Sequence, residues 1–339
     1  FHIHAEESHM TAKSTRPIGA LILGDMPPDR IVDVCQNLEI SGFSEIWVAE
    51  DYFMLSGFAS AAMALQSTRQ ITVGIGAISG RVRHPAVTAM EAATLAGAHP
   101  GRLKLAIGHG VPAWTSQMKL KPKSFLKSFR ECTSAVKRLL NGETLNEDGA
   151  YYSFDAVKLT YPAPELDVFG AVVGPKSIDL CAEISDGIVL SVLAGPKYVE
   201  TVRHNVEKIR NAKGLPAKFD IVTYVLASVG DDKQEVKNGL KGVAAFYLDA
   251  MGATLMTGVY GANEQLQQMI ADGGADAIAE NMPDDWMDWL TIGGTPDDCI
   301  QSIRNLFDAG TTSIVLCLMP TSDIDTQIKR FSESVLPKI

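Results

Sequence analysis

Six short polar or glycine-containing segments each follow directly after a run of apolar residues. Their carboxyl, phenol, imidazole and hydroxyl groups are types that exchange protons, and their glycines let a ligand approach the backbone. The segments are Gly24-Asp25, Glu50-Asp51-Tyr52-Phe53, Gly76-Ala77-Ile78-Ser79, His109-Gly110-Val111, Gly174-Pro175-Lys176 and Ser191-Val192. None contains a Ser-His-Asp set, a cysteine beside a base, or an HExxH motif. Such groups suit a large planar ligand whose own atoms do the chemistry.

A metal site is not expected. His84, His99, His109 and His204 fall on different predicted elements, and no spacing suggests a cluster of ligands. Three further histidines lie in FHIHAEESHM, residues 1–10, which we interpret as an expression-tag remnant with Met10 as the native start.

The six segments fall at the ends of predicted strands in a chain that alternates strand and helix. The strands are predicted at residues 17–24, 45–51, 71–77, 102–110, 166–174, 187–191, 219–230 and 312–320. They are nearly all apolar throughout, as in a parallel sheet that is covered on both faces. Eight strand-helix units predict an α/β fold, a (β/α)8 TIM barrel, in which the active site lies where strands end and helices begin. Residues 11–339 are expected to form this single domain.

Two stretches do not fit the repeat. Residues 145–165 are predicted to form a β-hairpin inserted after helix 4. Residues 231–292 are predicted to form a helical insertion after strand 7, rich in aromatic residues and methionine. These side chains either hold a flat apolar substrate or pack the insertion helices together. They are Phe246, Tyr247, Met251, Met256, Trp286, Met287 and Trp289.

Composition limits the partners. The chain has 339 residues, of which 46% are hydrophobic and 21% charged, with a formal net charge of −10. An acidic surface repels nucleic acid and anionic membranes, so neither is expected as a partner. No apolar run is long enough to span a membrane. Five cysteines without a CxxC spacing are expected to be buried thiols, which suits a cytoplasmic protein.

Five motifs, in this order along the chain, resemble the bacterial-luciferase-like superfamily. They are EIWVAEDYF, VGIGA followed by RHPAVTAMEAATL, LKLAIGHG, VVGPKSIDLCAEISDGIVLS and GGTPDDCIQSIRNLFDAG. The resemblance spans residues 17 to 335. It points to the branch that uses coenzyme F420 and includes methylenetetrahydromethanopterin reductase and F420-dependent glucose-6-phosphate dehydrogenase. It implies F420 as the cofactor, with FMN as the alternative, and an insertion that lies over the barrel mouth.

The resemblance also implies a cofactor site around the third and fourth strands. The third strand of relatives ends in a bulge with a non-proline cis peptide against the isoalloxazine, here placed at Gly76-Ala77 and continuing into Ile78. His109 and Gly110, at the end of the fourth strand, are expected to contact the cofactor. His109 has an alternative interpretation as a hydrogen-bonded structural residue.

The segment VVGPKS could bind an anion through its backbone. A strand ends in Gly174, Pro175 opens a helix, and the first amides of that helix attract an anion. We expect the amides of Gly174, Lys176 and Ser177 to be free, although an ordinary strand-helix turn would have the same sequence. The resemblance assigns this loop to the cofactor phosphate, with Ser191 beside it.

Catalytic roles follow from the segment AEDYF. In several related enzymes an aspartate here contacts the deazaflavin edge and a following histidine is an acid. This chain keeps Asp51 and has Tyr52 in place of that histidine. Val111 stands where the sugar-phosphate dehydrogenase has a glutamate, which argues against sugar-phosphate oxidation. Asp51, Tyr52 and His109 are therefore the predicted catalytic residues, and two proton donors favour reduction of the substrate.

Three functions stay open at this stage. The first is an F420-dependent oxidoreductase that transfers hydride between deazaflavin C5 and a small organic substrate. The second is a monooxygenase using FMNH2, and the third is a non-catalytic flavin-binding protein. No GxGxxG motif offers a nicotinamide site, so a separate F420 or flavin reductase is expected to supply the reduced cofactor. The resemblance further implies a homodimer.

Overall fold

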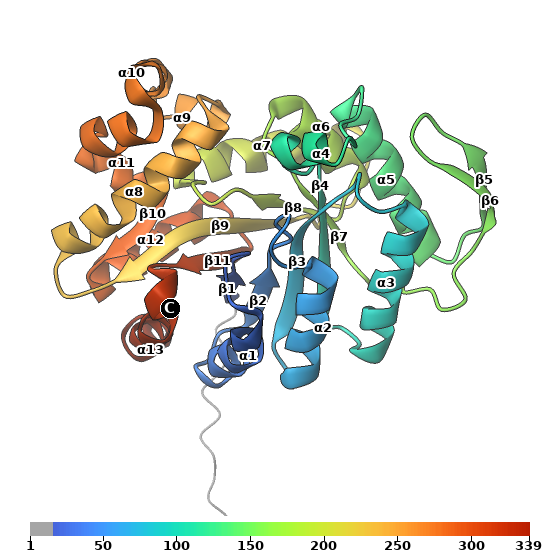
Figure 1. Cartoon of the computed structure of the whole chain (residues 1–339), viewed down its shortest axis with the longest axis horizontal. Helices are drawn as coiled ribbons and strands as arrows, with labels where there is room; N and C mark the ends of the chain where they lie inside the picture. Colours follow the sequence, from blue (N-terminus) through green and yellow to red (C-terminus); the bar gives the residue numbers. More distant parts are fainter. Residues whose placement is uncertain (1–15) are drawn as a thin grey trace, which may run out of the picture.

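Eight parallel strands close into a barrel that is surrounded by helices (Figure 1). The computed structural model describes residues 16–339, so the predicted tag remnant lies outside the described residues. The barrel strands are β1 (Ile18–Ile22), β2 (Glu45–Val48), β3 (Thr72–Ser79), β4 (Leu103–Gly108), β7 (Val168–Ala171), β8 (Gly187–Leu190), β9 (Asp220–Val229) and β11 (Ser313–Leu318). β9 pairs with both β8 and β11, and β11 pairs with β1, which closes the barrel. The predicted (β/α)8 fold is confirmed.

The helices that cover the barrel mostly begin where the sequence places a start signal. They are α1 (Ile31–Ile40), α2 (Gly57–Ser67), α3 (Pro85–Ala98), α4 (Pro112–Gln117), α5 (Phe125–Leu140), α6 (Pro175–Ile184), α7 (Pro196–Ala212), α12 (Pro296–Ala309) and α13 (Ile324–Ser334). Proline opens α3, α4, α6, α7 and α12, because it fixes a helical φ and lacks an amide that would have no intrahelical partner there. None of the helices within residues 16–339 is both long and apolar enough to cross a membrane.

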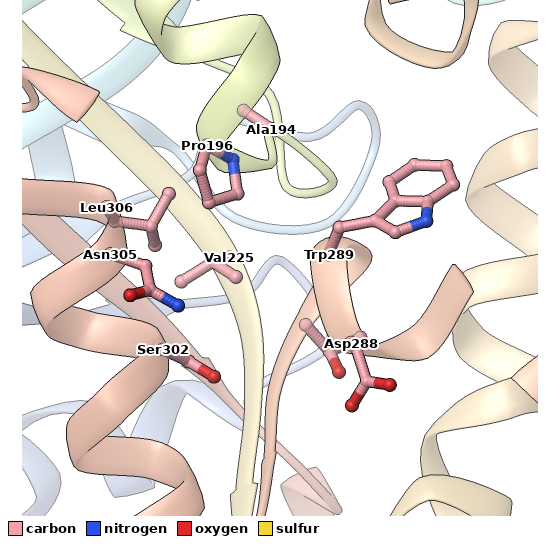
Figure 2. A pocket seen from close by; sticks show the side chains of 9 residues that line it. Ala194, Pro196, Val225, Asp288, Trp289, Ser302, Asn305 and Leu306 are labelled. Carbon is pink, nitrogen blue, oxygen red and sulfur yellow. The ribbon is translucent and has the colours of Figure 1, made fainter. Parts of the chain in front are cut away.

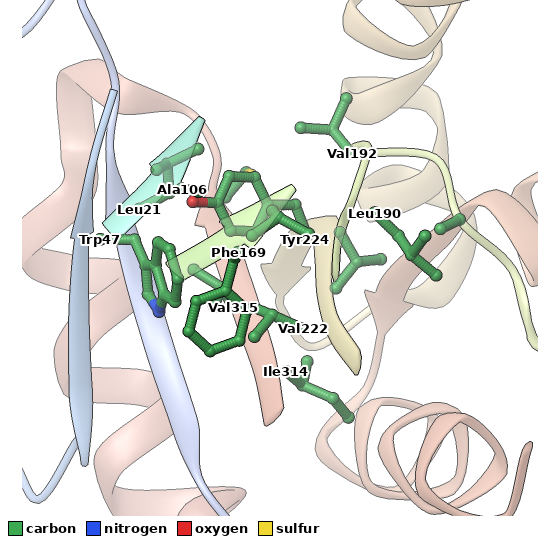
Figure 3. Packing of buried hydrophobic residues seen from close by; sticks show 14 of the residues in the cluster. Leu21, Trp47, Ala106, Phe169, Leu190, Val192, Val222, Tyr224, Ile314 and Val315 are labelled. Atoms are coloured by element: carbon green, nitrogen blue, oxygen red, sulfur yellow. The ribbon is translucent and has the colours of Figure 1, made fainter. Parts of the chain in front are cut away.

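Three aromatic side chains fill the barrel interior (Figure 3). The Trp47 ring packs edge-on against Phe169 and Tyr224, with ring centroids 6.0 and 5.7 Å apart. A Cβ atom on Gly74 would collide with the Trp47 ring, and one on Gly76 would collide with the Tyr224 hydroxyl. The glycines of β3 therefore make room for the aromatic core of the barrel.

Both insertions are present, with one correction. The hairpin consists of β5 (Leu145–Asp148) and β6 (Ser153–Val157). The helical insertion contains α8 (Lys233–Met251), α9 (Leu255–Gly258), α10 (Asn263–Asn281) and α11 (Asp284–Leu290). Its predicted end at residue 292 is wrong, because Thr291 and Ile292 belong to a short strand, β10 (Thr291–Gly294). β10 pairs with residues 226–229 of β9, beyond the stretch of β9 that pairs with β8.

Candidate functional site

A buried carboxylate, Glu50, organises the loop after β2. Glu50 is 5% exposed, and Arg83 pairs with both of its oxygens, at 2.6 and 2.8 Å. The Tyr52 hydroxyl donates to Glu50 Oε1 at 2.6 Å, and the Gly57 amide donates to Oε2 at 3.0 Å. Burial, and then the hydrogen bond to Glu50, raise the pKa of Tyr52 above its usual value. Tyr52 can therefore protonate a substrate only if it gives up its bond to Glu50.

Asp51 lies against the end of β1. Burial raises the pKa of Asp51, the hydrogen bond from the Gly24 amide lowers it, and the charges of Asp25 and Glu50 raise it. A Cβ atom on Gly24 would lie 2.7 Å from the Asp51 Cβ, so glycine is required for this contact. A carboxyl group with a raised pKa is a better proton donor near neutral pH than an ordinary surface aspartate.

The end of β3 has the predicted irregular backbone. The Gly76-Ala77 peptide is cis, which confirms that expectation. The pairing of β3 with β4 shifts register between Ile75 and Ile78, as a bulge requires. The Tyr224 hydroxyl donates to the Gly76 carbonyl at 3.4 Å. Ala77 is half-buried, whereas Ile78 is fully buried, so Ile78 supports the bulge from the core and has no surface to offer a cofactor.

His109 follows β4 and is bonded to the start of α6. Its Nε2 is 2.9 Å from the Ser177 hydroxyl, and its ring packs edge-on against Phe125 and Phe129. Burial lowers the pKa of His109, which favours the neutral imidazole at neutral pH. The predicted pair of Tyr52 and His109 is thus divided, because Tyr52 bonds to Glu50 and His109 bonds to the first turn of α6.

The segment Gly174-Pro175-Lys176 is exposed at the start of α6. Within 4 Å of a Cβ built on Gly174 only the Ser177 hydroxyl is found, at 4.0 Å, so this backbone is open to a ligand. The Ser177 amide donates to the Gly174 carbonyl at 2.9 Å. The expectation that this amide is free is therefore wrong. The Ser177 hydroxyl, in contrast, lies beside Gly174.

A groove between α5 and α6 opens beside this loop. Its lining includes three cationic side chains and two carboxylates. These residues are Lys127, Arg130, Lys176, Asp179 and Glu183. Glu183 pairs with Arg130 at 3.3 Å, whereas Lys127 and Lys176 line the groove without an ion pair in the described part of the chain.

The insertion divides into packing residues and residues near the mouth. Met256, Trp286 and Met287 are buried, which confirms the packing interpretation for them. Trp289 stacks on Tyr260 at 3.9 Å. In contrast, the Met251 sulfur accepts a hydrogen bond from Ser191 at 3.3 Å. Burial, and then the charges of Cys317, Asp51 and Asp25, raise the pKa of Tyr247 to about 12.

A small pocket lies between α11 and α12, beside Ala194 and Pro196 at the start of α7 (Figure 2). Asp288 and Trp289 of α11 form one side of it, and Ser302, Asn305 and Leu306 of α12 form the other. It contains none of the six segments singled out by the sequence, so we do not assign the function to it. Among residues 16–339, no cluster of histidine, cysteine or acidic residues could hold a metal ion.

Sequence reasoning missed how four side chains act at the mouth. Glu50 was named without a role, Arg83 was not assigned to the site, and Tyr224 and Ser177 were not predicted to contact Gly76 and His109. One signal was available for the first pair. A glutamate that directly follows a buried strand needs a cation, and Arg83 follows the next strand along the chain.

Comparisons with known proteins agree with this architecture. The family model of luciferase-like monooxygenases matches residues 3–313. A 5,10-methylenetetrahydromethanopterin reductase from Archaeoglobus fulgidus is 26% identical, covering 89% of this chain and 93% of the relative. An F420-dependent glucose-6-phosphate dehydrogenase from Beutenbergia cavernae is 25% identical, covering 89% of this chain and 90% of the relative.

A solved structure shares the fold. The coenzyme F420-dependent tetrahydromethanopterin reductase from Methanopyrus kandleri superposes with a TM-score of 0.82 at 22% identity, covering 96% of this chain and 99% of that one. Together with the family match, which spans most of the chain, these findings confirm the predicted superfamily: the protein belongs to the luciferase-like monooxygenase family.

Proposed function

We propose that the protein is an F420-dependent oxidoreductase, which transfers hydride between C5 of the deazaflavin and a small organic substrate. The observation that carries the proposal is the pairing of two features at one barrel mouth. One is the β3 bulge between Ile75 and Ile78, and the other is the open backbone of Gly174 at the start of α6. The named relatives that use F420 support the choice of cofactor.

The residues present fit such a cofactor. Gly76, Ala77 and Gly110 would contact the ring system, since they are small residues at the ends of β3 and β4. Gly174 and Lys176, with Ser191 beside them, would hold the phosphate through their backbone amides and the dipole of α6, which Pro175 begins. His109 would act through Ser177, whose hydroxyl it orients at 2.9 Å. When bound, the cofactor supplies the hydride chemistry, and the chain supplies binding, orientation and the proton.

The proton is assigned to Asp51. Tyr52 is committed to Glu50, and His109 is held as a neutral imidazole beside Ser177. Among the predicted catalytic groups, Asp51 has a raised pKa, which makes its protonated, donating form more common near neutral pH. Because reduction of an acceptor needs a proton delivered to it, we propose that the enzyme reduces its substrate.

The surroundings favour an apolar substrate over a sugar phosphate. Phe53 is 69% exposed, Met54 is 62% exposed and Val111 is 44% exposed, all in loops that follow β2 and β4. Phe246 of α8 is also exposed. An electron-poor double bond, imine or aromatic ring would suit these groups, and no carboxylate stands at position 111 to deprotonate an alcohol.

The alternative cofactor is FMN in a luciferase-like monooxygenase, which the family's description favours. The two are separated by titrating the protein with oxidised F420 and with FMN while following ligand fluorescence. The proposal expects saturable binding of F420 at a concentration at which FMN does not bind. Binding of FMN with no binding of F420 would favour the monooxygenase.

Two further proposals concern the setting. We propose a cytoplasmic homodimer that receives reduced cofactor from a separate reductase. Val87 and Met90 on α3 are exposed apolar residues, which supports an interface with a second copy of the chain on this side of the barrel. Light scattering that gave the mass of one chain at micromolar concentration would contradict the dimer.

A further inference from the structure

The hydrogen bonds of Glu50 join three segments around the barrel mouth. Its carboxylate accepts two bonds from Arg83 after β3, one from Tyr52 after β2 and one from the Gly57 amide that begins α2. A buried carboxylate is costly unless it is paired, and these four donors occupy the usual capacity of its two oxygens. Glu50 thus has no lone pair to offer a ligand, and any effect it has on chemistry passes through the groups it holds.

The next two residues point to different partners. The Tyr52 hydroxyl is fastened to Glu50, and its ring packs edge-on against Trp114 of α4 with centroids 6.1 Å apart. Asp51 packs instead against Gly24 at the end of β1, so closely that a Cβ atom there would lie 2.7 Å from it. The loop is therefore held by contacts on both sides of Asp51.

We propose that Glu50 is a positioning residue, which with Arg83 fixes Tyr52 and the loop of residues 50–57 so that Asp51 faces the edge of the cofactor. The inference rests on the proposed function, in which Asp51 carries the proton. It gives Tyr52 a positioning role as well, since its hydroxyl bonds to Glu50 and not to substrate.

Glu50 also acts on Asp51 through charge. The charges of Asp25 after β1 and Glu50 after β2 act on Asp51, and the charge of Asp51 acts in turn on Tyr224 of β9 and Tyr247 of α8. The charge of Glu50 contributes to the raised pKa of Asp51. Removing that charge therefore lowers the pKa of Asp51. Tyr52→Phe removes a contact of the same loop but keeps the charge of Glu50, so comparing the two variants separates charge from packing.

The test compares Glu50→Gln, Tyr52→Phe and the double variant with the wild type. The matched control is Glu91→Gln, because Glu91 is the second carboxylate on Arg83, 3.2 Å from its Nε. The measurement is the dissociation constant of oxidised F420, by fluorescence, over a series of pH values. The thermal midpoint of each variant shows whether it is folded.

We expect Glu50→Gln to weaken the binding of F420 about tenfold, which is the usual effect of losing one hydrogen bond to a charged group. The inflection in the pH dependence of binding should move to lower pH. The double variant should bind no more weakly than Glu50→Gln alone, because Tyr52 acts through Glu50. Glu91→Gln should bind as the wild type does.

Equal effects of Glu50→Gln and Glu91→Gln on binding and on its pH dependence would overturn the inference. If Glu50→Gln does not fold, Tyr52→Phe decides, since it removes only one hydroxyl; unchanged binding in that variant also overturns the inference. A wild type that binds FMN and not F420 would contradict the proposed cofactor instead, and the same series run with FMN then tests Glu50.

Discussion

The two sides of the barrel mouth are built in opposite ways. On the side of β2 and β3, Tyr52 and Arg83 form three side-chain hydrogen bonds with the buried carboxylate of Glu50. On the side of β7, Gly174, Pro175 and Lys176 are exposed and offer backbone. A proton donor must be held in one orientation, whereas an anion is held by amides that any small residue can present. The first side is therefore sensitive to side-chain chemistry and the second to backbone access.

The largest effect is expected on the side-chain side. Asp51→Asn keeps the shape of Asp51 and removes its proton, so anaerobic oxidation of F420H2 by an electron-poor alkene should slow by about 100-fold, a usual share for general acid catalysis. Binding of F420 should persist. The matched control is Asp25→Asn, which removes the neighbouring exposed carboxylate after β1. Equal turnover in Asp51→Asn and the wild type would remove Asp51 as the acid.

The next effect is expected on the backbone side. Gly174→Val places a branched side chain where the phosphate should approach, and binding of F420 should weaken at least about tenfold, or about 1.4 kcal/mol. The space around Gly174 is open, so the fold should tolerate the change. Gly97→Ala on α3, where a Cβ also meets nothing, is the control for folding. Unchanged affinity would show that the anion binds elsewhere.

A smaller loss of F420 affinity is expected for His109, which contacts the loop at the start of α6. His109→Ala removes the partner of the Ser177 hydroxyl, and F420 binding should weaken about fivefold, as for one hydrogen bond of ordinary strength. The turnover of the bound complex should change less than its affinity. A loss that appeared in turnover with affinity intact would instead make His109 a proton donor to the substrate.

The smallest effect concerns stability. Because burial raises the pKa of Asp51, its protonated form is favoured by folding, and this contribution is present below the unfolded pKa and lost as the pH rises through the folded pKa. Asp51→Asn should therefore raise the thermal midpoint slightly at neutral pH, because asparagine has no charge to bury. The gain should vanish below about pH 4, the ordinary pKa of aspartate. A lower thermal midpoint for Asp51→Asn than for the wild type at neutral pH would contradict the raised pKa of Asp51.

The sequence predicted the scaffold better than the contacts across it. Apolar runs followed by helices located all eight barrel strands, because a parallel sheet covered on both faces has a strong pattern. β10 was missed because Thr291-Ile292-Gly293-Gly294 is short and continues directly from α11. The bond between His109 and Ser177 joins residues 68 positions apart, and no local pattern indicates it. Arg83 and Glu50 follow the neighbouring strands β3 and β2, so the order of the strands indicated their pairing, but only the structure shows that Arg83 bonds to both oxygens of Glu50.

The central claim is that one mouth holds the cofactor between the two sides. The most direct measurement is a crystal structure of the wild type with oxidised F420. The account predicts the deazaflavin ring against Gly76-Ala77, with Asp51 at its edge and the phosphate at the amides of Gly174 and Lys176. A phosphate bound elsewhere, or a ring outside the barrel mouth, would contradict it.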